Sequence, residues 1–137
     1  MSLYVIDAWP VVEWLLGKQP VAHNFTLFLN ACEQEGTRLL ITRINRAEIL
    51  YTLIKRVPDV DQSRAFESFE RLALEVVSID DALVDEATVL KGRYACSFAD
   101  CFAAALAMRM KASVVTGDKE FLALHYAGLL TLEWLGA

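Results

Sequence analysis

Short apolar runs alternate with longer helical patterns along the whole chain, and this alternation is the feature that most restricts the fold. The runs that predict strands are residues 3–7, 39–42, 75–79, 112–116 and 129–132. Strands that are separated by helices pair in parallel, because each crossover needs a dozen or more residues. We therefore expect an α/β fold of three layers, with a central, mainly parallel sheet of four to five strands flanked by helices.

Glycine, proline and capping residues indicate where the helices begin and end. The expected helices begin near residues 10, 20, 44, 59, 81, 97 and 119. The helix over residues 44–56 ends before Pro58, and its core stripe is expected at Ile44, Ala47, Tyr51 and Ile54. Asp59 or Asp61 is the expected cap of the next helix, and Gly92 is the expected end of the one after it.

Length and composition predict one globular domain over residues 1–137, since a single pattern runs through the 137 residues. Apolar residues make up 55% of the chain, and the mean hydropathy is +0.35. This excess indicates a thick core and an apolar surface that needs a partner. The longest apolar run, residues 101–108, lies between Asp100 and Arg109. It is far shorter than the roughly 18–20 residues that cross a membrane, so we expect no membrane association.

Charge and cysteine content narrow the choice of compartment and partner. The N-terminus has no basic segment or cleavage site, and the three cysteines lack metal or disulfide spacing, so we expect reduced thiols in the cytoplasm.

A net charge of −5 argues against binding to nucleic acid by bulk charge. It does not exclude a nuclease whose acids form a metal site. Six basic residues either contact phosphate locally or lie on solvated helix faces, and the sequence leaves both alternatives open: Arg43, Arg46, Lys55, Arg56, Lys91 and Arg93.

Four acidic residues are expected at one edge of the predicted sheet. Asp7 directly follows the first strand, and Asp118 follows the fourth strand across one glycine. The carboxyl ends of parallel strands share an edge, where ligands bind in open α/β sheets. Glu48 lies on a half-apolar helix face, and Asp100 shares its helix face with alanines at 103, 104 and 107. A charge on such a face needs a partner or a metal ion.

Each acid also has a purely structural interpretation. Asp7 and Asp118 are suitable N-caps for the helices that follow them. Ser97 and Asp100 have the spacing of a capping box. Glu48 has Lys55 and Arg56 nearby in sequence, or can reach solvent.

Convergence of four carboxylates favours a bound cation. Two carboxylates about 5 Å apart repel by roughly 3 kcal/mol at an effective dielectric constant of 20. Oxygen ligands suit Mg²⁺ or Mn²⁺, whereas His23 and His125 lie outside the spacing of a zinc site. Such an ion is suited to phosphodiester hydrolysis by an activated water. Thr116 can hydrogen-bond a carboxylate or the phosphate, or can be an ordinary strand residue.

The chain resembles the PIN-domain nucleases, and in particular the small VapC-type toxins of toxin–antitoxin pairs. The resemblance rests on four segments in order: Tyr4-Val5-Ile6-Asp7-Ala8, Arg46-Ala47-Glu48-Ile49-Leu50, Ser97-Phe98-Ala99-Asp100-Cys101 and Thr116-Gly117-Asp118-Lys119-Glu120-Phe121. It implies a PIN-like fold and an endoribonuclease that uses Mg²⁺ or Mn²⁺, held by Asp7, Asp100 and Asp118 with Glu48 in the same cluster.

The resemblance also implies a homodimer, an RNA substrate and a cognate antitoxin. The antitoxin surface is expected near the first two helices, at Trp9, Trp14, Leu15, Phe25 and Phe28. Two positions depart from the family pattern. Trp9 stands where many relatives have serine or threonine, and Glu120 stands where relatives often have a second aspartate after the last acid.

Three other functions are weighed against the nuclease. A non-catalytic PIN-like interaction module would bind no divalent metal and would tolerate Asp→Asn changes. A phospho-accepting receiver domain needs an aspartate at the end of the third strand, where this chain has Val77-Ser78-Ile79. A phosphatase of the haloacid dehalogenase type needs an aspartate two residues after Asp7, where Trp9 stands.

Overall fold

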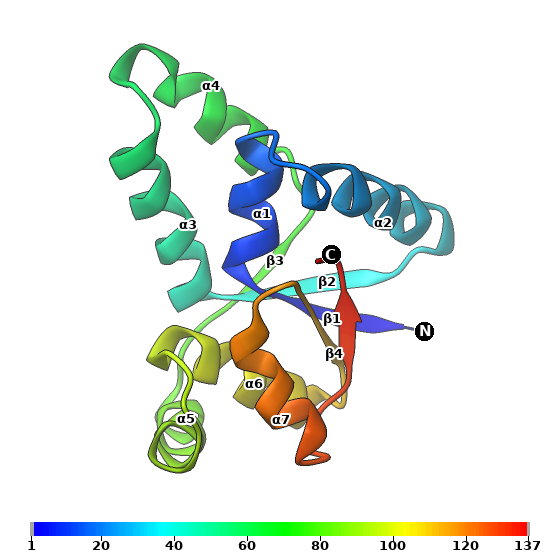
Figure 1. Cartoon of the computed structure of the whole chain (residues 1–137), viewed down its shortest axis with the longest axis vertical. Helices are drawn as coiled ribbons and strands as arrows, with labels where there is room; N and C mark the ends of the chain where they lie inside the picture. The colour runs from blue at the N-terminus through cyan, green and yellow to red at the C-terminus, as the bar shows by residue number, and fades with distance from the viewer. Residues whose placement is uncertain (1, 137) are drawn as a thin grey trace.

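The computed structural model describes residues 2–136, which form a five-stranded parallel sheet with helices on both faces (Figure 1). The strands are β1 (Leu3–Ile6), β2 (Arg38–Thr42), β3 (Glu75–Val77), β4 (Ser113–Thr116) and β5 (Leu132–Trp134). The helices are α1 (Ala8–Leu15), α2 (Val21–Glu35), α3 (Arg43–Arg56), α4 (Asp59–Glu70), α5 (Asp81–Arg93), α6 (Phe98–Met110) and α7 (Leu122–Tyr126), with a 3₁₀ turn η1 (Lys119–Phe121). The expected three-layer α/β fold is confirmed.

The strand order β3-β2-β1-β4-β5 places β1 at the centre of the sheet. The chain builds outward from β1 in one direction through β2 and β3, and in the other through β4 and β5. The order therefore reverses between β1 and β4, and a reversal of this kind leaves a crevice at the carboxyl ends of the two strands. Asp7 follows β1 and Asp118 follows β4, so both aspartates lie at this crevice.

Alternation along the central strands separates two hydrophobic cores, because successive strand residues point to opposite faces. On one face, Ile6 and Val115 pack with residues of α1, α2, α3 and α4. On the other face, Val5 and Val114 pack with α5, α6 and the segment around Phe121. Figure 1 shows the two groups of helices on either side of the sheet. No helix among residues 2–136 is both long enough and apolar enough to cross a membrane.

The core stripe expected on α3 is wrong. The side chains of Tyr51 and Ile54 are 49% and 58% exposed, and Ile44 and Ala47 are exposed as well. The buried side of α3 carries Asn45, Ile49 and Leu53 instead. Both sides of this helix have apolar residues at helical spacing, so the pattern alone does not decide its orientation. We call the exposed apolar residues Ile44, Ala47, Tyr51 and Ile54 the α3 face.

Several element boundaries also differ from the sequence prediction, and β3 ends at Val77 instead of residue 79. Strand β5 is Leu132–Trp134 rather than residues 129–132, because Leu129 closes α7 through a hydrogen bond from its N–H to the carbonyl of Leu124 and Leu130 enters the core. Helix α5 continues through Gly92 to Arg93. At α4, the residue that caps the helix is Pro58, and no side chain caps it.

The expected antitoxin surface near the first two helices is partly wrong. Phe25 and Phe28 are buried in the core against Tyr4 and Trp14, so neither side chain is open to a partner. Trp14 and Leu15 are partly exposed. The amphipathic pattern of α2 places both phenylalanines on its inner face, as expected for a helix that covers a sheet.

Candidate metal centre

Asp7 is held rigidly at the end of β1. Its carboxylate is 1% exposed and caps α1, with Oδ1 accepting a 2.9 Å hydrogen bond from the N–H of Ala8. Oδ2 accepts a 2.8 Å hydrogen bond from the hydroxyl of Thr116, which lies at the end of the neighbouring strand β4. The interpretation of Asp7 as an N-cap is therefore confirmed, and the cap leaves the carboxylate directed at the crevice between the strands.

Asp118 lies beside Asp7 because the same threonine joins them. The N–H of Asp118 donates a 3.0 Å hydrogen bond to Thr116 Oγ1. Asp118 Oδ1 in turn accepts a 3.0 Å hydrogen bond from the N–H of Glu120, so Asp118 caps η1. One hydroxyl thus connects the ends of β1 and β4 and the two acids that follow them.

Asp100 enters the same region from the first turn of α6. Ser97 caps this helix, with its hydroxyl accepting a 3.2 Å hydrogen bond from the N–H of Asp100. The return half of a capping box is missing, since the N–H of Ser97 lies 3.5 Å from a carboxylate oxygen of Glu120 instead. Asp100 is 4% exposed, and its buried Oδ2 has no hydrogen-bond partner among the described residues.

Glu48 completes the group from α3. It is half-buried, and its Oε1 is buried without a hydrogen-bond partner in the described part of the chain. No ion pair between residues 2 and 136 involves Glu48, Lys55 or Arg56. The pairing of Glu48 with one of these bases, which the sequence left open, is not observed.

The four acids surround one cavity of about 140 Å³, which we call the acid cavity. One carboxylate oxygen from each of Asp7, Asp100 and Asp118 lies within 4.8 Å of the others. This spacing is short enough for the three groups to share one cation. The ligand atoms are all carboxylate oxygens, which fits Mg²⁺ or Mn²⁺ and does not fit zinc.

The electrostatics of the acid cavity also favour a cation. Burial and then the charges of Glu48 and Asp118 raise the pKa of Asp7 to about 7, against the opposing effect of the hydrogen bond from Thr116. Burial, followed by the neighbouring carboxylates of Glu120, Asp7 and Asp118, raises the pKa of Asp100 to about 10. Burial and then the charges of Asp118 and Glu120 raise the pKa of Glu48. A divalent ion would offset the burial and the mutual repulsion that raise these pKa values.

Besides the buried residues Ala8 and Val12, four further side chains line the acid cavity: Trp9, Glu13, Thr52 and Arg56. They are partly or fully exposed, whereas Asp7 and Asp100 are buried, so these four form the mouth of the cavity. Figure 1 shows the two helices that carry them, α1 and α3, side by side. The sequence analysis did not identify Glu13 and Thr52. The spacing of Glu48, Thr52 and Arg56 at i, i+4 and i+8 is the signal that could have found this helix face.

Asn45 is a third residue that the sequence analysis missed. It is fully buried in α3, and its side-chain N–H donates a 3.2 Å hydrogen bond to the carbonyl of Ala99 in α6. Thr42 caps α3 and bonds to both the N–H and the side chain of Asn45. This link fixes α3 against the turn of α6 that carries Asp100. The Thr42-x-x-Asn45 spacing resembles a capping motif and was the available signal.

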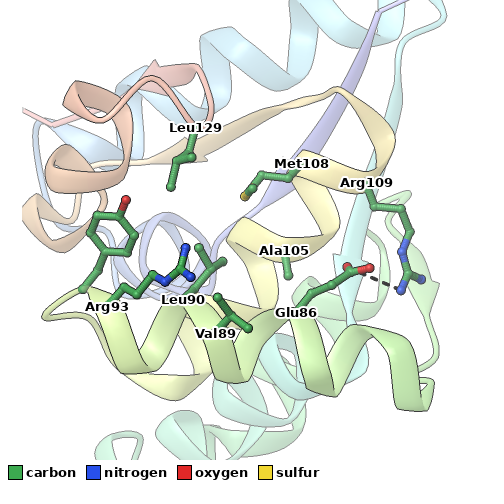
Figure 2. A pocket seen from close by; sticks show the side chains of 9 residues that line it. Glu86, Val89, Leu90, Arg93, Ala105, Met108, Arg109 and Leu129 are labelled. Carbon is green, nitrogen blue, oxygen red and sulfur yellow. Dashed lines mark ion pairs between the residues drawn. The ribbon is translucent and has the colours of Figure 1, made fainter.

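A larger groove lies between α5 and α6, away from the acids (Figure 2). Its volume is about 450 Å³, and Val89, Leu90, Ala105, Met108 and Leu129 supply apolar walls. Arg109 forms a 3.6 Å ion pair with Glu86 across its rim. Its lining contains none of the four acids, so the candidate chemistry belongs to the smaller acid cavity.

Fold and site together define an α/β protein with a cluster of carboxylates at the carboxyl edge of its sheet, and the sequence family agrees. The PIN domain family model matches residues 4–125, so the chain belongs to the PIN domain family. No curated protein matches the sequence.

Solved structures with the same fold include several toxin–antitoxin proteins. VapBC2 from Rickettsia felis, bound to a DNA fragment from its promoter, is 18% identical, with a TM-score of 0.70 over 96% of this chain and 97% of that one. VapC20 of Mycobacterium tuberculosis, a sarcin–ricin loop cleaving toxin, is 17% identical, with a TM-score of 0.69 over 96% and 98%. A toxin–antitoxin complex from Klebsiella pneumoniae is 15% identical, with a TM-score of 0.62 over 88% and 90%. At these identities the likeness concerns the fold.

Proposed function

We propose that this chain is a Mg²⁺-dependent endoribonuclease that acts in the cytoplasm as the toxin of a toxin–antitoxin pair, with residues 1–137 forming one PIN domain. The observation that carries the proposal is the group of three carboxylate oxygens from Asp7, Asp100 and Asp118 within 4.8 Å of one another. Asp100 Oδ2 is buried there, and no group of residues 2–136 forms a hydrogen bond with it. A buried carboxylate oxygen with no donor is costly unless a cation occupies the space beside it.

The proposed roles follow from the contacts of each residue. Asp7, Asp100 and Asp118 are the ligands of Mg²⁺ or Mn²⁺, and Thr116 holds Asp7 in position. When bound, the ion supplies a water of lowered pKa and positive charge beside the phosphate oxygens. Glu48 Oε1 is buried without a hydrogen-bond partner from residues 2–136, and burial raises the pKa of Glu48. Both features suit a group that orients this water and accepts its proton. Glu120 is an auxiliary acid beside Asp100.

RNA as substrate and an antitoxin as partner are supported by the neighbours of known structure. One is described as a sarcin–ricin loop cleaving toxin and another as a toxin–antitoxin complex. The α3 face adds a feature of this chain, because its large apolar side chains lie open to solvent. Apolar surface of this kind is typical of a protein–protein interface. A homodimer or an antitoxin would cover it.

The test compares the purified wild-type protein with Asp100→Asn on total RNA and on single-stranded DNA of matched length. We expect the wild type to cleave RNA with Mg²⁺ and not with EDTA, and the variant to lose at least 100-fold in rate. Asp85→Asn is the matched control, because Asp85 is exposed on α5 and the change in charge is the same. Full activity of Asp100→Asn, or wild-type activity in EDTA, would favour a non-catalytic PIN-like module or a different chemistry.

The pair itself is tested by expression in a bacterial host. Expression of the wild type alone should arrest growth, and co-expression of the protein encoded by the adjacent reading frame should relieve the arrest. Sedimentation of the purified chain should give about twice the 15.3 kDa of one copy. Growth arrest by Asp100→Asn at the same expression level would separate toxicity from nuclease activity.

A further inference from the structure

The exposure of the lining residues increases from the inner, acidic end of the acid cavity to its mouth. Asp7 and Asp100 are buried at the inner end, whereas Trp9 is partly exposed and Arg56 is exposed at the mouth. The mouth therefore combines an aromatic ring on α1 with a cationic side chain at the last residue of α3, beside the carboxylate of Glu13 and the hydroxyl of Thr52.

The size of the acid cavity limits what it can hold. Its volume of about 140 Å³ corresponds to roughly five water molecules at about 30 Å³ each. This is enough for a cation and a phosphate group but too small for a whole nucleotide. A nucleotide whose phosphate reaches the acids must place its base outside, against the side chains of the mouth.

Trp9 is fixed beside the acids by a close contact with Gly117. A Cβ atom at Gly117 would lie 2.9 Å from Trp9 Cη2 and closer still to Cζ3. The edge of the indole ring therefore packs directly on the residue between Thr116 and Asp118. A ring that is already held in place loses little conformational entropy when a base stacks on it.

Resting on the nuclease function proposed above, we propose that Trp9 stacks on a base of single-stranded RNA while Arg56 binds a phosphate of the same strand. A base is free to stack on an aromatic side chain only when it is not paired in a duplex. Arg56 forms no ion pair within residues 2–136, so its charge is open to a phosphate. A chain of net charge −5 needs such a local cation to hold RNA beside four acids.

Trp9 is tested first by its fluorescence. The variant Trp14→Phe/Trp134→Phe leaves Trp9 as the single tryptophan, and it is titrated with hexamers of adenylate or uridylate. Ca²⁺ replaces Mg²⁺, and denaturing gels verify that the RNA stays intact. We expect quenching by both hexamers, stronger with adenylate because a purine offers a larger stacking surface. Binding without quenching would overturn the stacking role.

Steady-state kinetics of the full chain give an independent test. Trp9→Leu should raise KM about tenfold or more, as expected for one lost stacking contact, while kcat changes less than threefold. Trp9→Phe should restore most of the affinity. Trp14→Leu is the matched control on the same helix. The indole N–H of Trp14 donates a hydrogen bond to the hydroxyl of Thr26, and Trp14 does not line the acid cavity. Equal KM values for Trp9→Leu and the wild type would overturn the proposal.

Arg56 is tested by the salt dependence of binding. Arg56→Gln should weaken binding of both hexamers equally and reduce the slope of log K against log salt by about 0.7, the value for one phosphate contact on a single strand. Lys55→Gln makes the same change in charge, but the ammonium of Lys55 lies 5.3 Å from the ring of Tyr51. An equal effect of the two variants would overturn the specific contact. Absence of any metal-dependent RNA cleavage by the wild type would instead overturn the nuclease function itself.

Discussion

Thr116 donates a 2.8 Å hydrogen bond to the carboxylate of Asp7, although 109 residues separate them in the chain. The same oxygen accepts the N–H of Asp118. Adjacent parallel strands bring the three residues together, because Ile6 pairs with Val115 in the sheet and the next residues continue at the same edge. A hydroxyl that orients a metal-binding carboxylate acts on the metal through that carboxylate, and its loss affects affinity although it is not itself a ligand.

We expect Thr116→Val to lower the affinity for Mn²⁺ by about 10- to 100-fold, as is typical when such an outer hydrogen bond is removed. The change keeps the side-chain shape but leaves Asp7 Oδ2 and the N–H of Asp118 without a partner. Isothermal titration calorimetry with Mn²⁺ measures the effect. Thr116→Ser keeps the hydroxyl and should bind within about threefold of the wild type. Equal affinities for all three proteins would show that the hydroxyl does not position Asp7.

Asp100→Asn should stabilise the metal-free protein at neutral pH. Because the pKa of Asp100 is raised to about 10 in the folded state, against about 3.9 in the unfolded chain, the folded state binds the proton more tightly. This contribution to stability is full below pH 4 and is lost progressively as the pH rises. The variant has no such proton, so its Tm should exceed that of the wild type at pH 8, and the difference should vanish near pH 4.

Metal should reverse this order. Mg²⁺ at the proposed site should stabilise the folded wild type, because a ligand that binds the folded state and not the unfolded chain shifts the equilibrium toward folding. The Tm of the wild type should then rise with Mg²⁺ concentration, while that of Asp100→Asn stays nearly constant. Differential scanning calorimetry at pH 4 and pH 8, with Mg²⁺ or EDTA, measures both effects. Asp85→Asn should follow the wild type in every condition. A lower Tm for Asp100→Asn at pH 8 in EDTA would contradict the raised pKa.

Gly117→Ala should destabilise the fold by about 1–3 kcal/mol, because the added methyl group overlaps Trp9 and approaches the N–H of Gly136. Trp9→Leu removes the overlapping ring, so the double variant should recover part of the loss, with a coupling of about 0.5–3 kcal/mol. Urea denaturation of the four proteins measures this cycle. Gly92→Ala is a contrasting change, since Gly92 lies in α5 with open space around it, and alanine there should stabilise by up to about 1 kcal/mol.

The position of the acids could be predicted because it depends on topology more than on side-chain detail. Asp7 and Asp118 directly follow buried strands, and any parallel pairing of those strands brings them to one edge. The orientation of α3 could not be predicted in the same way. Its apolar residues lie on two sides, and the buried hydrogen bond from Asn45 to Ala99 helps to decide which side faces the sheet. A hydrophobic pattern does not register a polar contact of this kind.

The mouth of the acid cavity depends on packing between elements that are distant in sequence. In the sequence, Trp9 stood out as the absence of a hydroxyl and as part of an expected antitoxin surface, and not as part of the acid site. Its contact with Gly117 requires β1 and β4 to be neighbours and Gly117 to lack a side chain. Thr52 and Arg56 reach the cavity only because α3 lies beside α1. These relationships follow from the three-dimensional arrangement, and no local pattern contains them.

The α3 face gives a test of self-association that is separate from the chemistry. Ile54 is 58% exposed and lies beside Tyr51, so Ile54→Glu introduces a charge into this apolar surface without disturbing the core. We expect the Tm of an isolated copy to change little, since exposed substitutions are usually worth less than about 0.5 kcal/mol, and the mass in sedimentation to shift from dimer toward monomer. Val60→Glu is the matched control, because Val60 is exposed on α4 outside this face. A dimer that forms equally in both variants would place the contact between copies elsewhere and leave the α3 face for the antitoxin, which a binding titration with the adjacent gene product would then test.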